Sequence, residues 1–198
     1  MESFAYRAVV MGTSAGGMQA LKTILPALPE SFPLPIAIVQ HMQESADDFL
    51  AEYLNGISPL TVKEAEDKEP FSPGTVYLAP AGYHLLIEAD QTFSLSVDVR
   101  ENYCCPAIDA LFESAAEVFG EALIGVVLTG ANGDGSHGLK TIKARGGFAI
   151  VQNPVTAESD YMPAAALAAT PVDRVGDLEQ IASLLVHCSE VSEKNIYG

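Results

Sequence analysis

The sequence predicts a doubly wound α/β fold, in which a mostly parallel sheet carries helices on both faces (a three-layer α/β/α arrangement) with an inserted β-hairpin region. Short, almost uniformly apolar segments read as strands buried on both faces. Each is followed by a turn and a segment of helical periodicity, and this alternation implies a parallel sheet. The 198 residues fit a single core. In such sheets, ligands bind beyond the carboxyl ends of the strands.

Two strand–helix units are expected in the N-terminal part of the chain. They comprise a strand at 8–11, a tight turn at 12–17, a helix at 18–25, a strand at 36–39 and a helix through about residue 54. Pro26 ends the first helix, and the spacing from Ser45 to Asp48 is that of a capping box for the second.

The pattern changes between residues 61 and 99, where short segments replace the longer units. Segments 76–79, 84–88 and 93–97 are each too short for a helix and are rich in apolar residues. We expect hairpin-like strands inserted into the α/β plan.

The C-terminal half returns to alternating strands and helices. Pro106 suits the first position of a helix, because its missing N–H would be unpaired there anyway. The expected elements are this helix, a strand at 123–129, a glycine-rich loop at 130–138, a helix to about 145, a strand at 148–151, a helix at 161–169 and a last amphipathic helix capped by Asp177.

Composition excludes several classes of protein. The chain has 26 acidic and 10 basic residues and a formal charge of −16, which disfavours binding to nucleic acid or anionic lipid. No apolar run approaches the roughly 18 residues that a membrane span needs, so we expect no direct membrane insertion. The N-terminus lacks a signal-peptide pattern, which predicts a cytoplasmic location. Cys104, Cys105 and Cys188 lack Cys-x-x-Cys spacing and are interpreted as reduced thiols.

The residues from Gly12 to Gly16 read Gly-Thr-Ser-Ala-Gly, the Gly-x-Ser-x-Gly pattern of a nucleophile elbow. Small flanking residues allow a strained turn that exposes Ser14 at a strand end. The helix that follows directs backbone N–H groups at the same point, so the Ala15 amide is the expected oxyanion donor. The alternative is a phosphate-binding glycine loop, but Ser14 stands where a dinucleotide loop needs its second glycine.

Two histidines compete for the role of base. His41 directly follows the second apolar strand, which places it on the same rim of the sheet as Ser14. A structural hydrogen-bonding role is the alternative for this residue. His137 is the rival base, but it lies three residues after Asp134 in one loop, whereas triads usually draw on separate loops.

Asp134 lies in the glycine-rich loop after the third apolar strand and is the expected acid. A buried carboxylate there would orient His41 and stabilise its protonated form. A helix N-cap and a cation-binding loop are the alternatives, although the spacing of a calcium loop is not met.

Together, these motifs resemble the catalytic domain of the bacterial chemotaxis methylesterase (CheB) family over about residues 7 to 186. The matching segments, in the order of the family, are 10–17, 40–42, 62–67, 73–80, 128–135 and 152–153. The resemblance implies a CheB-type domain over 1–188 with a C-terminal tail at 189–198. It also implies a catalytic triad of Ser14, His41 and Asp134, with Ala15, Gly16 and Ala131 as oxyanion or loop residues.

The implied activity is hydrolysis of γ-glutamyl methyl esters on methylated chemoreceptor cytoplasmic helices, with glutamine deamidation as a related activity. No metal or organic cofactor is implied, and the oligomeric state is not specified. Cys105 stands where the family has an arginine, so substrate recognition is expected to differ. The catalytic strand begins within the first ten residues, so we expect no control by a receiver domain in cis. A non-catalytic scaffold and a serine esterase or amidase acting on another substrate are the alternatives.

Overall fold

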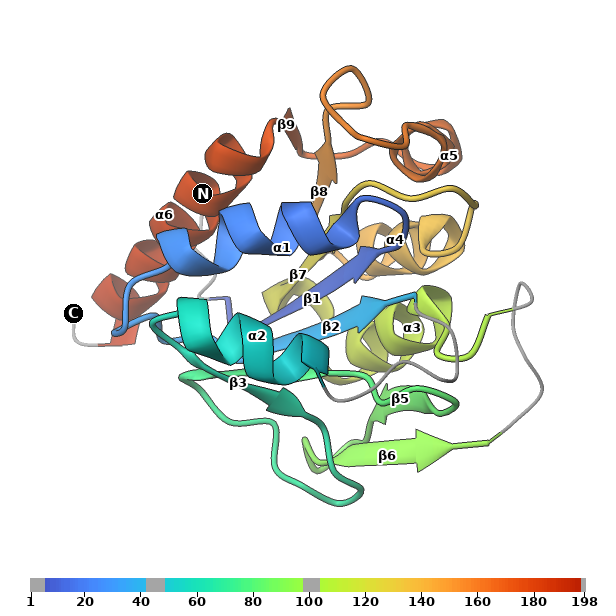
Figure 1. Cartoon of the computed structure of the whole chain (residues 1–198). Coiled ribbons are helices and arrows are strands. Elements are labelled where there is room, and N and C mark those ends of the chain that lie inside the picture. The colour runs from blue at the N-terminus through green and yellow to red at the C-terminus, as the bar shows by residue number, and fades with distance from the viewer. Residues whose placement is uncertain (1–5, 42–48, 98–103, 197–198) are drawn as a thin grey trace.

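The computed structural model describes residues 6–41, 49–97 and 104–196, with side chains described to residue 190. A sheet of seven parallel strands forms its centre, in the order β3-β4-β2-β1-β7-β8-β9 (Figure 1). The strands are β1 (Ala8–Thr13), β2 (Ile36–Gln40), β3 (Thr61–Glu64), β4 (Thr75–Leu78), β7 (Leu123–Val127), β8 (Phe148–Gln152) and β9 (Arg174–Gly176). A separate antiparallel hairpin joins β5 (His84–Ile87) to β6 (Phe93–Ser96).

Helices cover both faces of the large sheet, which confirms the three-layer arrangement. One face packs against α1 (Gly17–Ile24), α2 (Phe49–Ile57) and α6 (Leu178–Ile196). The other packs against α3 (Ile108–Phe119), α4 (Ser136–Ala144), α5 (Tyr161–Ala169) and the β5–β6 hairpin. Short 3-10 turns occupy Leu25–Ala27 and Gly120–Ala122. Within the described residues, no helix is long and apolar enough to cross a membrane.

Strand β1 shows why the apolar segments are uniform. Val9 and Met11 belong to the core beneath α1, α2 and α6, whereas Ala8 and Val10 belong to the core on the opposite face. All four side chains are fully buried. Because both faces are covered, the strand has no polar alternation.

The expectation for residues 61–99 was only partly correct. The hairpin of β5 and β6 exists, but β4 is a parallel strand of the main sheet, paired with β2, and β3 pairs with its outer edge. Strand β4 is short yet buried on both faces, with Val76 in one core and Tyr77 in the other. Strands β3 and β9 were not predicted, because edge strands of four and three residues carry little periodicity.

Two helix boundaries also differ from expectation. Helix α3 begins at Ile108 rather than at Pro106, with extended Ala107 before it, and the Cys105–Pro106 peptide bond is cis. Helix α6 continues through Ile196, into the segment expected to be a tail. The expected capping box from Ser45 to Asp48 lies outside the described residues.

Strand order places three strand ends together. The chain moves outward from β1 through β2 to the β3 edge and then returns to place β7 on the other side of β1. The carboxyl ends of β2, β1 and β7 are therefore neighbours at the point where the order reverses, which is where doubly wound sheets bind ligands.

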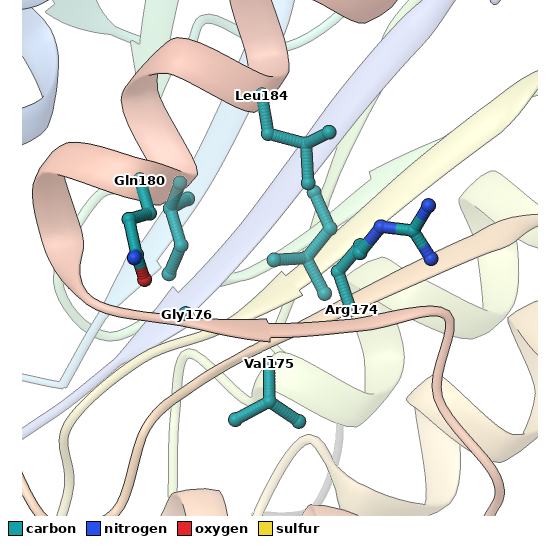
Figure 2. A pocket seen from close by; sticks show the side chains of 7 residues that line it. Arg174, Val175, Gly176, Gln180 and Leu184 are labelled. Atoms are coloured by element: carbon teal, nitrogen blue, oxygen red, sulfur yellow. The ribbon is translucent and has the colours of Figure 1, made fainter.

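A hollow of about 310 Å³ lies at the β9 edge of the sheet, between β9 and α6 (Figure 2). Apolar side chains such as Val175 and Leu184 line it, and Arg174 is its single charged residue. The residues that line this hollow include no nucleophile and no base. The candidate catalytic residues lie at the carboxyl ends of β2, β1 and β7.

Candidate active site

Ser14 and His41 lie directly beyond the ends of two adjacent strands. The backbone N–H of His41 donates to the carbonyl oxygen of Thr13 at 3.0 Å, which continues the pairing of β1 with β2. The backbone N–H of Ser14 donates to the carbonyl oxygen of Thr129 at 3.0 Å, which ties it to the segment after β7. Both residues therefore lie on the predicted rim of the sheet.

The turn after Ser14 carries its unusual backbone geometry at a glycine. Gly16 has φ 81°, a left-handed conformation that side chains disfavour. Among the described residues with positive φ, only Lys68 and Gln91 are not glycine, so the expected strain at Ser14 itself is absent. At Gly17, an added Cβ would lie 1.9 Å from Oε1 of Gln40, so a side chain there would displace Gln40. The glycines allow the tight turn into α1 without straining the serine.

Gln40, which the sequence reasoning did not single out, ties the serine turn to the histidine. Its Nε2 donates to the carbonyl oxygens of both Ser14 and His41, each at 2.9 Å. One side chain thus fixes the spacing between the two proposed catalytic residues. Its position at the end of a strand, next to His41, was the only signal in the sequence.

Replacing Gln40 with methionine is expected to lower kcat/KM for the ester hydrolysis that the sequence resemblance implies by about 10- to 100-fold. Methionine has a similar side-chain volume but lacks the N–H donor of Gln40. The loss should appear mainly in kcat, since the change disturbs alignment of Ser14 with His41 rather than substrate contacts. Steady-state kinetics measure the split, and Gln19→Met on exposed α1 is the control. A fall in thermal stability with kcat unchanged would show that Gln40 is only structural.

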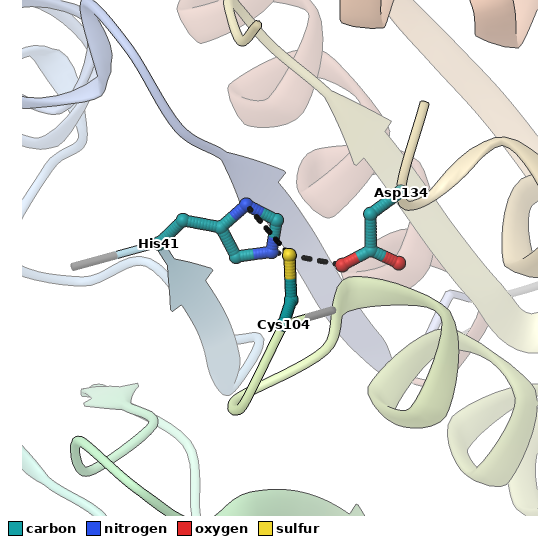
Figure 3. A group of neighbouring side chains, drawn as sticks. All are labelled: His41, Cys104 and Asp134. Carbon is teal, nitrogen blue, oxygen red and sulfur yellow. Dashed lines mark hydrogen bonds and ion pairs between the residues drawn. The ribbon is translucent and has the colours of Figure 1, made fainter. Parts of the chain in front are cut away.

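His41 and Asp134 form a close pair (Figure 3). Nε2 of His41 lies 2.8 Å from Oδ2 of Asp134, with side chains 11% and 0% exposed. The carboxylate accepts a hydrogen bond from the Nε2–H group, so the lone pair of the neutral ring lies on Nδ1. The pairing is the predicted one, and Nδ1 is the nitrogen available to act as a base.

Backbone amides hold Asp134 in its ionised form. Oδ2 accepts the N–H of Ile108 at 2.7 Å, while Oδ1 accepts those of Asp109 and Gly135, each at 3.0 Å. Burial raises the pKa of Asp134, but the hydrogen bonds from His41 and these amides outweigh it and lower the pKa overall. The first turn of α3 therefore supplies the charge stabilisation that a triad carboxylate needs.

Two further side chains contact Nδ1 of His41, the nitrogen that does not face Asp134. Nδ2 of Asn132 lies 3.3 Å from Nδ1, and Sγ of Cys104 lies 3.8 Å from it. Asn132 also contacts the thiol at 3.4 Å and accepts the N–H of Asp134 through Oδ1 at 3.0 Å. The sequence predicts only a reduced thiol at Cys104, and it singles out no role for Asn132 within the segment 128–135.

The residues expected near an oxyanion are exposed or partly exposed. Ala15 and Ala131 are exposed, and Gly16 is half-buried. Within the described part of the chain, no oxygen accepts a hydrogen bond from the backbone N–H of Ala15 or Gly16. These amides precede α1 and could receive a developing negative charge, although their catalytic role stays a prediction.

The remaining histidines lie away from this pair. His137, the rival base, pairs with Glu113 of α3 through Nδ1 at 2.6 Å, and its side chain is 73% exposed. His84 is buried, and its Nδ1 accepts the N–H of Ala107 at 3.2 Å. His187 is exposed on α6. The structure therefore brings His41, not His137, to Asp134.

Asp109 is a second buried carboxyl group beside Asp134. Its Oδ1 accepts the N–H of Gly138 at 2.6 Å. Burial, together with the nearby charges of Asp134 and Glu113, raises the pKa of Asp109 to about 6. The raised pKa means that ionising Asp109 opposes folding.

Asp109→Asn is therefore expected to stabilise the fold above about pH 6, by up to roughly 3 kcal/mol for a shift of about two pKa units. The folded-state pKa lies above the unfolded value, so the stability that Asp109 contributes is present at low pH and is lost as the pH rises through 6. Urea unfolding from pH 4 to 8 measures this, with Asp160→Asn as the exposed control. Equal stabilisation by Asp109→Asn at every pH would contradict the argument.

Ser14 at the end of β1 and the His41–Asp134 pair at the end of β2 lie at neighbouring strand ends, but no hydrogen bond joins the Ser14 hydroxyl to His41 among the described residues. These are the residue types that serine hydrolases use. A family model described as CheB methylesterase matches residues 9–185. The chain belongs to the CheB methylesterase family, a family of hydrolases.

Individual relatives agree with this assignment. A protein of similar length from Leptospira interrogans is 52% identical over 185 residues, which cover 93% of this chain and 96% of that protein. The protein-glutamate methylesterase/protein-glutamine glutaminase 1 of Carboxydothermus hydrogenoformans is 45% identical over 180 residues, covering 88% of this chain and 53% of that protein. The crystal structure of the Thermotoga maritima CheB methylesterase catalytic domain matches with a TM-score of 0.89 and 37% identity, covering 93% of this chain and 99% of that chain.

Proposed function

We propose that this chain hydrolyses γ-glutamyl methyl esters on the cytoplasmic helices of methylated chemoreceptors and also deamidates glutamine side chains there. Ser14 is the nucleophile, His41 the base and Asp134 the residue that orients the base. The observation that carries this proposal is the 2.8 Å pair of His41 and Asp134. His41 follows β2, the strand that pairs with β1, and Ser14 follows β1. The names of the relatives support protein glutamate methyl esters and glutamines as the substrates, and the chemoreceptor helices are what the resemblance to the CheB family implies.

Each residue has a defined task in the two half-reactions. His41 Nδ1 takes the hydroxyl proton as Ser14 Oγ attacks the ester carbonyl carbon, and the amides of Ala15 and Gly16 stabilise the oxyanion. The protonated His41 then gives its proton to the leaving methoxide, which departs as methanol. Water, deprotonated by His41, attacks the acyl-serine and releases the γ-carboxyl group. With glutamine, ammonia leaves in place of methanol.

The test is methanol release from methylated chemoreceptor membranes by the purified chain, with mass spectrometry of receptor glutamines for deamidation. We expect release in proportion to enzyme. A chain that reacts with a fluorophosphonate probe but releases no methanol would act on another substrate. A chain that does neither would be a scaffold, and the proposal would fail.

A further inference from the structure

We propose that His41 and Cys104 form a binding site for a thiophilic divalent cation of the zinc type, and that occupancy of this site switches the hydrolase off. The switch rests on the proposed function, because it acts on the proposed base. The binding site itself depends only on the geometry around Cys104.

The donor atoms already lie close to the spacing that a metal requires. Zinc binds histidine nitrogen at about 2.0–2.1 Å and cysteine sulfur at about 2.3 Å, so two such donors on a tetrahedral ion lie roughly 3.5 Å apart. His41 Nδ1 and Cys104 Sγ are 3.8 Å apart. A shift of a few tenths of an ångström would therefore bring both atoms to bonding distance. Figure 3 shows the thiol directed toward the imidazole ring.

The surroundings of His41 are those of a metal-binding histidine. Metal-bound imidazoles usually donate their second N–H to a carboxylate, which fixes the ring and makes it a better ligand. Asp134 accepts the Nε2 proton of His41 at 2.8 Å, which leaves Nδ1 directed toward the thiol.

Asp134 is better placed as the outer partner than as a direct ligand. One donor atom from each of His41, Cys104 and Asp134 lies within 4.8 Å of the others. However, both oxygens of Asp134 accept backbone N–H groups of α3 and its own loop. A metal bond would have to displace these amides. We therefore assign two protein ligands to the ion and leave its other positions to water.

Among the described residues, Asn132 is a side chain that must yield to the ion. Its Nδ2 contacts both His41 Nδ1 and Cys104 Sγ, at 3.3 and 3.4 Å, and thus occupies the place of the ion. An N–H donor is satisfied equally well by water, and the residue is only partly buried. Because two ligands hold the ion, binding should be reversible rather than structural.

The bound ion would consume the lone pair that catalysis uses. His41 Nδ1 must accept the Ser14 proton, and a nitrogen bound to a metal cannot do so. Inhibition should therefore be reversed by a chelator. It should also depend on Cys104, which takes no part in the proposed triad.

The binding test is titration of the purified chain with Zn²⁺ by calorimetry and with Co²⁺ by absorption. We expect one ion per chain and a sulfur-to-cobalt charge-transfer band. Cys104→Ala should weaken zinc binding by about ten-fold or more and abolish the band. Cys105→Ala, a change at the neighbouring thiol outside the metal-donor group, should leave both nearly unchanged. Binding that is absent, or insensitive to Cys104→Ala, would overturn the site.

The switch is tested by measuring the rate of ester hydrolysis twice for each variant, once with Zn²⁺ and once with excess chelator. Inhibition is the ratio of these two rates. For the wild type, the rate at saturating Zn²⁺ should fall to the background level, because the metal-bound His41 has no lone pair for catalysis. Cys104→Ala should need about ten-fold more ion for the same inhibition. Zinc binding through Cys104 without any inhibition would overturn the switch. Because binding is measured without substrate, a chain inactive on receptors still tests the site.

Discussion

Replacing Ser14 with alanine is expected to lower turnover of glutamyl methyl esters by about 10⁴- to 10⁶-fold, because no acyl-enzyme can form without the hydroxyl. Folding should be affected little. Ser14 is fixed by backbone hydrogen bonds to Thr129 and Gln40, which alanine retains. The free energy of unfolding of Ser14→Ala should stay within about 0.5 kcal/mol of that of the wild type. Methanol release and urea unfolding measure the two quantities.

Ser183→Ala is the matched control, because Ser183 lies on the exposed face of α6 and its hydroxyl donates to the Glu179 carbonyl of the same helix. It should leave turnover unchanged. A fluorophosphonate probe should label the wild type and the control but not Ser14→Ala. Equal labelling of Ser14→Ala would mean that another residue is the nucleophile.

The sequence was sufficient for the parts of the site that follow from strand order. His41 comes directly after an apolar strand, and the Asp134 loop follows another, so a parallel sheet necessarily brings both to one rim. The fold class followed from the same segments, because strands buried on both faces have no polar alternation.

Contacts made by side chains from distant loops could not be predicted in this way. Cys104 contacts His41 just beyond the end of β2, and nothing in the local sequence pattern indicates this contact. The same holds for the amides of Ile108 and Asp109, which bind Asp134 from the first turn of α3. Strand β4 was misassigned to a hairpin because a four-residue apolar segment looks the same in either sheet.

Asp134→Asn should be nearly as damaging to turnover as loss of the serine, with a fall of about 10⁴-fold. The reason lies in the donors that surround the carboxylate. Oδ2 accepts from His41 and Ile108, and Oδ1 accepts from Asp109 and Gly135. An asparagine replaces one of these oxygens by an NH₂ group. In either orientation of the side chain, this NH₂ donor faces N–H donors that need an acceptor.

Both orientations of that asparagine have measurable costs. If its NH₂ takes the place of Oδ1, the amides of Asp109 and Gly135 lose their acceptor, at about 1–3 kcal/mol for each buried group. If it takes the place of Oδ2, His41 must accept at Nε2 and carry its proton on Nδ1, where it can no longer act as a base. Asp134→Asn should therefore lose both activity and stability.

Comparison with His41→Gln separates the two roles of Asp134. His41→Gln should also lose about 10⁴-fold in turnover, but it leaves the backbone donors of Asp134 in place, so its stability should fall less than that of Asp134→Asn. Because the two residues act as one unit, the double variant should be hardly less active than either single variant. Asp160→Asn at the exposed start of α5, where the side chain makes no capping hydrogen bond, is the control. If Asp134→Asn kept more than about one-tenth of wild-type turnover with unchanged stability, Asp134 would neither orient the base nor anchor α3.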